Sequence, residues 1–311
     1  MIPFLNARVT SRLAACAALL AILGAAGTVP AAASTGTPAA GPPDILTAPT
    51  LIAKTHDGPV GYREVGKGSP IILIMGFGGS MDYWPPSFVD ALAAGHTVVV
   101  FDNAGIGDTT ALPSPLSVSA MAGQASALIG ALHLGRTAVL GWSLGGMIGQ
   151  ALAATHPHQV SKLILAATQA GTGASLPIPP AAAAALASSN LATVLSVLFP
   201  PDQAAAAQAY VEGIVQYQGF YGASDAVKAQ QTAAVAQWMA GQDPAGRRLR
   251  SIQAPTLVAD GTLDQLNPVP NDRLLAHGIP RAGLLLYPDA GHAFLFQDAA
   301  QFVPVVERFL R

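Results

Sequence analysis

The sequence predicts an α/β protein with a mostly parallel, doubly wound sheet of about eight strands and a helical cap inserted between the sixth and seventh strands. Short, continuously apolar runs alternate with helix-length segments from about residue 50 onward. Such runs are typical of strands buried on both faces of a parallel sheet. The stretch 172–250 interrupts the alternation because it contains no strand-like run. A chain of 311 residues that is 51% hydrophobic is also long enough for a large core.

The elements of the predicted domain, residues 50–311, follow in order along the chain. An opening hairpin is expected because Asp57-Gly58 is a turn signal between two strand-like runs. The expected strands are 51–55, 60–65, 71–75, 97–101, 138–140, 163–166, 256–259 and 284–287. The expected helices include 119–134, 145–155 and 294–310. Strand and helix therefore alternate as in a sheet flanked by helices.

The long segment 172–250 is rich in alanine and proline. It could form Ala-rich surface helices, or a helical cap over a functional site. We favour the cap, because an insertion of this length inside a compact domain usually has a function.

The N-terminal part of the chain has a different composition. Arg8 and Arg12 are the only charges in the first forty residues, and they precede an apolar run and a series of small residues. This order predicts that residues 1–33 are a secretory signal peptide and that the protein is exported. The apolar run is shorter than the ~18 residues of a membrane span, so we expect no stable membrane insertion after cleavage. Residues 34–49 are expected to be a flexible leader.

Charge and cysteine content exclude several function classes. A net charge of −2 without a cluster of lysines and arginines argues against nucleic acid as a partner. The single cysteine, Cys16, lies in the predicted signal peptide, so the mature protein would have no disulfide and no thiol nucleophile. We expect neither a metal nor another cofactor, since the sequence has no metal-ligand cluster and no dinucleotide-binding fingerprint. The oligomeric state is left open.

The strongest chemical signal is Gly141-Trp142-Ser143-Leu144-Gly145, where a predicted strand ends and a helix begins. A serine on such a sharp turn projects its hydroxyl toward a substrate, and the flanking positions must be glycine because a Cβ would collide. The start of the helix also supplies backbone N–H groups for a developing oxyanion. Ser143 is therefore the candidate nucleophile.

A serine nucleophile needs a base and a carboxylate. His292 follows the last predicted strand, at the same edge of the sheet as Ser143, and is the candidate base. Asp264 lies far enough beyond the preceding strand to reach a histidine, whereas Asp260 is expected to end that strand. The other histidines are expected at turns or helix ends: His56, His96, His133, His156, His158 and His277.

Two backbone N–H groups are expected to form an oxyanion hole. Leu144, directly after the nucleophile, would supply one, and Phe77, in a glycine-rich loop after the third strand, would supply the other. That loop could also be no more than a flexible turn. Gly76, Phe77 and Trp142 are expected to line the substrate pocket.

Together these residues resemble the α/β-hydrolase superfamily, and the resemblance covers roughly residues 50–311. The chain order Ser143, Asp264, His292 is that of the superfamily. The stretch Phe101-Asp102-Asn103-Ala104-Gly105-Ile106-Gly107 is similar to one common in its cap-bearing members. Many members have a histidine before the oxyanion loop, where this chain has Met75. The resemblance implies a cofactor-free serine hydrolase, since the Asp-nucleophile members are excluded by Ser143.

The sequence thus favours an exported enzyme that cleaves small-molecule esters with apolar acyl groups, because few charges are available to bind a polar one. A cofactor-free perhydrolase of the haloperoxidase type and a proline-type aminopeptidase share the same motifs. A non-catalytic binding protein on this fold is a further alternative, disfavoured by the intact Ser, Asp and His.

Overall fold

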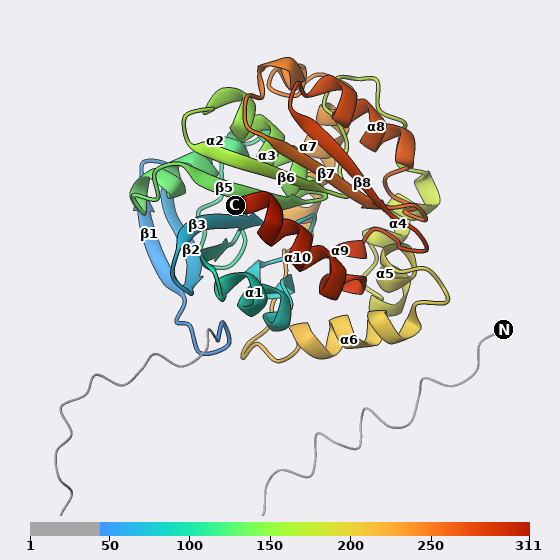
Figure 1. Ribbon diagram of the computed structural model, residues 1–311, viewed down its shortest axis with the longest axis horizontal. Helices are drawn as coiled ribbons and strands as arrows, with labels where there is room; N and C mark the ends of the chain where they lie inside the picture. The colour runs from blue at the N-terminus through green and yellow to red at the C-terminus, as the bar shows by residue number, and fades with distance from the viewer. Residues whose placement is uncertain (1–43) are drawn as a thin grey trace, which may run out of the picture. The chain divides into compact units, whose positions relative to one another are not determined.

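A computed structural model describes residues 44–311, which form an eight-stranded sheet flanked by helices (Figure 1). The strand order is β1-β2-β4-β3-β5-β6-β7-β8. β1 pairs with β2 and β2 with β4 in antiparallel fashion, and every other pairing is parallel. The strands are β1 (Leu51–Thr55), β2 (Gly58–Val65), β3 (Ser69–Ile74), β4 (His96–Phe101), β5 (Thr137–Trp142), β6 (Val160–Ala166), β7 (Thr256–Gly261) and β8 (Ala282–Tyr287). The predicted fold class, a mostly parallel sheet of about eight strands, is confirmed.

The strand order reverses at β3. After β3 the chain runs outward to β4 and then crosses back over β3 to β5. Where the connections of two neighbouring strands leave in opposite directions, a crevice forms at the carboxyl ends of these strands. Proteins with α/β sheets bind ligands in such crevices. Ser143 follows β5 and the loop beginning at Gly76 follows β3, so both lie at this point of the sheet.

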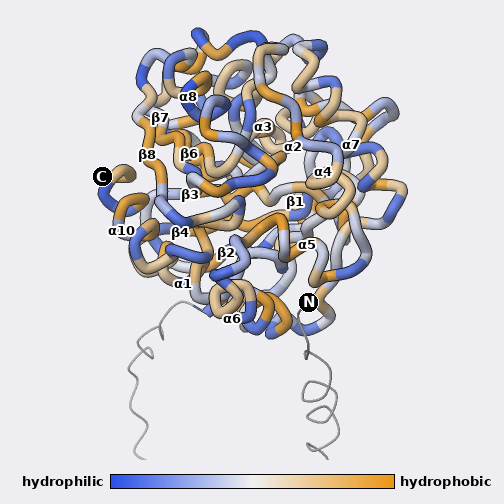
Figure 2. Tube along the Cα trace, turned by 90° about the vertical axis from the view of Figure 1, so that its right-hand side faces the viewer, coloured by the Kyte–Doolittle hydropathy of each residue, from blue (hydrophilic) through white to orange (hydrophobic). Residues whose placement is uncertain are grey.

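Helices cover both faces of the sheet and bury its apolar side chains. Helices α1, α9 and α10 contribute to the core on one face, and α2, α3 and α8 to the core on the other. Figure 2 shows the apolar stretches, in orange, along strands in the interior of the fold. These helices are α1 (Pro86–Ala93), α2 (Val118–Ala131), α3 (Leu144–Thr155), α8 (Val269–Gly278), α9 (Phe294–Gln297) and α10 (Ala299–Leu310).

Four further helices lie between β6 and β7, in the segment where the sequence predicts helices and no strand. They are α4 (Pro180–Leu186), α5 (Leu191–Leu198), α6 (Ala204–Ile214) and α7 (Asp225–Met239). We call residues 180–239 the helical insertion. An antiparallel bridge between Gly79 and Gly222 joins the stretch before α7 to the loop after β3.

The structure corrects several local expectations. The predicted helix 294–310 is two helices, because Asp298 adopts a non-helical conformation between α9 and α10. His96 is the first residue of β4 rather than a turn residue, with its ring Nδ1 3.2 Å from the carbonyl oxygen of Ser69. The flexible leader was expected to reach residue 49, but its end packs on the domain. Ile45 is fully buried, and its amide donates to Asp90 Oδ1. The expected signal peptide, residues 1–33, and residues 34–43 lie outside the described residues.

Within residues 44–311, no helix combines the length and the apolar character that crossing a bilayer requires.

Candidate active site

Ser143 occupies a strained turn between β5 and α3. Its backbone angles are φ 56° and ψ −119°, in the left-handed half of φ space that side-chain-bearing residues rarely adopt. The turn is held by hydrogen bonds on both sides, from the Ser143 amide to the Ala166 carbonyl and from Thr168 Oγ1 to the Ser143 carbonyl. Strain of this kind persists where the surrounding structure fixes it, and it is common at catalytic nucleophiles. The predicted strand–serine–helix arrangement is therefore present.

The two glycines that flank the turn are required by close backbone contacts. A Cβ on Gly145 would lie 1.9 Å from the carbonyl oxygen of Ile74 in β3, and a Cβ on Gly141 would lie 2.2 Å from the Gly145 carbonyl oxygen. Both distances are far below any van der Waals contact. The first turn of α3 thus packs directly onto β3, which brings Ser143 next to the loop that follows β3.

His292 and Asp264 meet at the same edge of the sheet. Their closest atoms, His292 Nδ1 and Asp264 Oδ2, are 2.7 Å apart, and both residues are at least nine-tenths buried. The other carboxylate oxygen of Asp264 accepts hydrogen bonds from the amides of Leu266 and Asn267. A carboxylate oxygen only accepts, so Nδ1 carries the proton and Nε2 of His292 is left as an acceptor.

Asp260, the alternative carboxylate, is directed elsewhere. Its two oxygens accept from the Gly261 amide and from Asn267 Nδ2, and it is fully buried. The same Asn267 Nδ2 also donates to Asp272 Oδ1, so two acids share one amide group. Burial, reinforced by the charge of Asp264, raises the pKa of Asp260 well above its usual range. The same two causes raise the pKa of Asp272 to about 8. The geometry therefore pairs His292 with Asp264 and not with Asp260.

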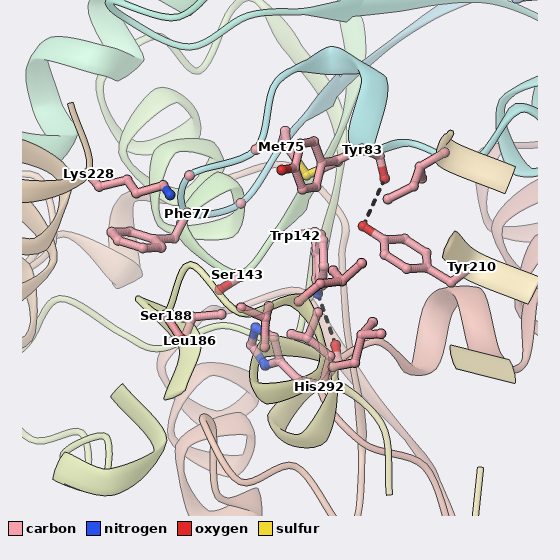
Figure 3. Close-up of a pocket in the computed structure, with 18 of the residues that line it drawn as sticks. Met75, Phe77, Tyr83, Trp142, Ser143, Leu186, Ser188, Tyr210, Lys228 and His292 are labelled. Atoms are coloured by element: carbon pink, nitrogen blue, oxygen red, sulfur yellow. Dashed lines mark hydrogen bonds between the residues drawn. The ribbon is translucent and has the colours of Figure 1, made fainter. Parts of the chain in front are cut away.

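The two predicted oxyanion donors, Phe77 and Leu144, line a cavity that Ser143 also lines. Leu144 is the first residue of α3, where a helical N–H has no partner within its own helix. In the part of the chain that the structure describes, the Phe77 amide also makes no hydrogen bond. Figure 3 shows Phe77 and Ser143 at the same part of the pocket wall. Both amides are thus available to an oxygen atom bound beside Ser143.

The loop that carries Phe77 is fastened to the rest of the protein on both sides. Asn103 Nδ2 donates to the Met75 carbonyl, and the Gly78 amide donates to Gln231 Oε1 of α7. The Ala223 amide donates to the Gly78 carbonyl. Met75, where many members of the superfamily have a histidine, is buried and packs against Gly79, whose Cβ would lie 2.8 Å from Met75 Cγ. This loop is therefore held in place rather than being only a flexible turn.

Trp142 contributes to the site in two ways. It lines a cavity that Ser143 also lines, together with Gly76 and Phe77. It also holds the histidine loop, because its indole Nε1 donates to the carbonyl oxygen of His292 at 2.9 Å (Figure 3). Its ring packs edge-on against Phe296 of α9.

Two cavities share Ser143 and His292 in their walls. The larger cavity, about 320 Å³, extends between the Gly76–Gly79 loop and helices α4, α5 and α6. The smaller cavity, about 120 Å³, is lined by Leu144 and Met147 of α3, by Leu266, and by residues of α4 and α7. Apolar side chains form most of both walls. The arrangement offers room for two substituents of unequal size on either side of a bound carbonyl group.

Some residues of the site were not predicted from the sequence. Lys228 of α7 lines the larger cavity, and Gln231, one turn later on the same helix, holds the Phe77 loop. Asn267, which bridges the buried acids, was also not singled out. A single lysine, glutamine or asparagine forms no recognisable sequence motif. The roles of Lys228 and Gln231 also depend on how the helical insertion packs. Within residues 44–311, no three His, Cys, Asp or Glu side chains gather in a way that could hold a metal ion.

Comparison with known proteins places this geometry in a family. The sequence model of the family described as alpha/beta hydrolase fold matches residues 69–299. The chain is 30% identical, over 273 residues, to a protein of Caulobacter sp. (strain K31) described as a carbamate hydrolase, RutD; the match covers 84% of this chain and 95% of that protein. It is also 30% identical, over 247 residues, to a poly(3-hydroxyalkanoate) depolymerase of Ectopseudomonas oleovorans, covering 78% of this chain and 84% of the relative.

A solved structure gives the same result. The alpha/beta hydrolase fold protein from Chitinophaga pinensis superposes with a TM-score of 0.75 at 29% sequence identity. The superposition covers 86% of this chain and 98% of that one. The proteins it resembles are hydrolases, and the chain belongs to the α/β-hydrolase family.

Proposed function

We propose that this protein is an exported serine hydrolase that cleaves carboxylic esters through an acyl-enzyme. The observation that carries the proposal is the 2.7 Å contact between His292 Nδ1 and Asp264 Oδ2 in a pocket that Ser143 also lines. A serine on a strained turn, a buried histidine oriented by a carboxylate, and two unused backbone N–H groups are the parts that acyl transfer requires.

In the first half of the reaction, the Ser143 hydroxyl oxygen attacks the ester carbonyl carbon while Nε2 of His292 accepts the hydroxyl proton. The carbonyl oxygen takes up the negative charge and is stabilised by the N–H groups of Phe77 and Leu144. When the tetrahedral intermediate collapses, the bond to the alcohol oxygen breaks, and His292 returns the proton to that oxygen. Asp264 keeps the ring in the required tautomer and stabilises its charged form.

In the second half, water takes the place of the alcohol. His292 accepts a proton from the water as its oxygen attacks the acyl carbon, and the same two N–H groups bind the oxyanion again. Collapse breaks the bond to the Ser143 oxygen, which recovers its proton from His292, and the carboxylic acid is released. The cycle consumes one water and needs no cofactor.

The walls of the two cavities support an ester with apolar substituents as the substrate. Leu144, Met147 and Leu266 line the smaller cavity, and most of the larger cavity is also apolar. Apolar substituents of an ester are stabilised there because they bury apolar surface against these walls. The depolymerase among the relatives is named for a polyester, which agrees with ester cleavage. The helical insertion is proposed to act as the cap that shields this pocket from water.

The direct test is hydrolysis of p-nitrophenyl esters of increasing acyl length by the purified protein. We expect turnover that is abolished in Ser143→Ala, whereas Gly123→Ala, a substitution in α2 away from the pocket residues, retains it. The perhydrolase alternative is tested with the same preparation by adding acetate, hydrogen peroxide, bromide and an organic compound that the oxidised bromide brominates. The aminopeptidase alternative is tested by offering proline p-nitroanilide. No turnover of any ester by the folded wild type would contradict the proposal.

Export is part of the same proposal, and the sequence of residues 1–33 supports it. Expression of the full chain in a bacterium with a working secretion system should yield, outside the cytoplasm, a protein whose N-terminus lies near Ser34. Retention of the full-length chain in the cytoplasm would contradict export without bearing on the ester chemistry.

A further inference from the structure

Among the described residues that line the two cavities, Lys228 is the one lysine, arginine, aspartate or glutamate. The walls otherwise consist of apolar side chains, hydroxyl groups, amides and His292. The smaller cavity has no such charge among its described lining residues. A cation at one side of an otherwise apolar pocket distinguishes the larger cavity from the smaller one.

The position of this lysine is fixed by its packing. Its methylene groups lie along Gly78, since a Cβ built on Gly78 would be 3.4 Å from Lys228 Cε and 3.7 Å from Cγ. Figure 3 shows the side chain extending from α7 toward the loop that carries Phe77. Gln231, on the same side of α7, accepts from the Gly78 amide, so the helix and the loop are joined. A lysine commonly lays its stem on apolar surface and leaves its ammonium group beyond it.

The ammonium group has no counterion in the part of the chain that the structure describes. No carboxylate lies within 4.0 Å of Lys228 Nζ, and no hydrogen bond involves that atom there. Asp225, the acid one turn earlier on α7, is exposed and does not pair with it. A half-buried cation without a partner, facing a substrate cavity, attracts an anionic group on the molecule that enters.

From this geometry we propose that Lys228 is a specificity-determining residue that binds a carboxylate on the longer arm of the ester substrate. The larger cavity takes that longer arm and the smaller cavity takes a short apolar arm, with the ester carbonyl at Ser143 between them. The preferred substrates are therefore mono-anionic esters with an apolar spacer between the ester and the carboxylate. This inference rests on the proposed ester hydrolysis and names the class of ester.

The test compares pairs of esters that differ only in the charge at the end of one arm. In the first pair, the mono-p-nitrophenyl ester of adipic acid is compared with the p-nitrophenyl ester of adipic acid monoamide, whose primary amide is neutral and nearly isosteric. In the second pair, the acetate ester of 6-hydroxyhexanoic acid is compared with that of its amide. The first pair puts the charge on the acyl arm and the second puts it on the alcohol arm.

The quantity measured is the ratio of kcat/KM for the anionic ester to that for its neutral partner. In the wild type we expect a ratio well above one for the pair whose charged arm occupies the larger cavity. Lys228→Met keeps most of the stem and should lower that ratio about tenfold, which corresponds to about 1.4 kcal/mol. Lys228→Arg keeps the positive charge and should retain most of the wild-type ratio. Lys67→Met, at an exposed lysine outside the pocket, changes the net charge equally and should leave the ratio at the wild-type value.

Salt provides a second measurement. The wild-type ratio should fall as ionic strength rises from about 10 mM to about 1 M, whereas the ratio for Lys228→Met should stay flat. Ratios for both pairs that are the same in wild type and in Lys228→Met would overturn this proposal, as would an equal change in Lys67→Met. Absence of any ester hydrolysis by the wild type would instead contradict the proposed function, so the two failures are distinguishable.

Discussion

The indole Nε1 of Trp142 donates a hydrogen bond of 2.9 Å to the backbone carbonyl oxygen of His292. The residue before the candidate nucleophile thus holds the loop of the candidate base, although 150 positions separate them in the chain. The contact joins the last residue of β5 to the loop before α9. It positions the imidazole relative to Ser143 without involving the side chain of either candidate catalytic residue.

Trp142→Phe tests this contact. Removing the N–H leaves the buried His292 carbonyl without its donor, which costs about 1–3 kcal/mol of stability. We also expect kcat for p-nitrophenyl butyrate to fall by about tenfold, because the base is less well positioned. Trp84→Phe is the matched control. Trp84 is also buried, but its Nε1 has no hydrogen-bond partner among the described residues. Equal losses of kcat in the two variants would show that the indole volume, not the hydrogen bond, matters.

The pairing of His292 with Asp264 rather than Asp260 leads to a second prediction. Asp264→Asn removes the acceptor that fixes the imidazole tautomer, and kcat/KM should fall by roughly 10³–10⁴ at neutral pH. Asp260→Asn should cost less than about tenfold, because Asp260 bonds only to Gly261 and Asn267. Steady-state kinetics with circular dichroism as a folding check measures both. A larger loss in Asp260→Asn would reverse the assignment.

The close packing of α3 on β3 can be measured as stability. Gly145→Ala places a methyl group 1.9 Å from the Ile74 carbonyl oxygen, so the turn must shift, and we expect a loss of about 3 kcal/mol or more. Gly123→Ala, in α2, meets nothing within 4 Å and should stabilise the protein by about 0.5–1 kcal/mol. Urea unfolding of both variants gives the two values. A Gly145→Ala variant as stable as wild type would contradict the close contact between α3 and β3.

The buried acids behind the histidine make stability depend on pH. In the folded protein the pKa of Asp272 is raised to about 8, chiefly by burial and then by the charge of Asp264. An unfolded aspartate has a pKa near 4, so between about pH 4 and pH 8 the folded state holds a proton that the unfolded state releases. The free energy of unfolding therefore falls as pH rises through that window.

Asp272→Asn should reduce the loss of stability that the protein shows as pH rises. We expect the difference in unfolding free energy between pH 5 and pH 8 to shrink by on the order of 2 kcal/mol, since Asp260 keeps its own contribution. Asp202→Asn, at an exposed aspartate of the segment before α6, should leave the difference unchanged. Urea unfolding at the two pH values decides the matter, and an unchanged pH difference in Asp272→Asn would contradict a proton held at this cluster.

Much of the fold follows from local patterns in the sequence. Continuous apolar runs mark strands buried on both faces, and each of the eight observed strands overlaps a predicted one. The positions of Ser143, Asp264 and His292 after β5, β7 and β8 follow from the same patterns, because parallel strands end at one edge. His96 was misplaced because it belongs to β4 through its pairing with Ser69 of β3, a contact between residues that are distant in sequence.

The parts of the site that depend on long-range packing could not be predicted. Lys228 and Gln231 lie in a helix of the insertion, and nothing near them in the chain indicates that α7 docks on the loop after β3. Asn267 is a more local case: it lies in the loop between β7 and α8 and bridges Asp260 in β7 to Asp272 in α8, but no sequence motif marks it. The break at Asp298 was missed because the apolar pattern of residues 294–310 continues across it.

The most direct test of the account is covalent labelling of the nucleophile. A fluorophosphonate forms a stable phosphonyl ester only with a serine that a neighbouring base activates. Incubation of the wild type with the probe, followed by peptide mass spectrometry, should give one adduct on Ser143, with labelling lost in Ser143→Ala and strongly slowed in His292→Ala. A folded wild type that stays unlabelled, or that is labelled on a different serine, would contradict the central claim that Ser143, His292 and Asp264 act as one catalytic unit.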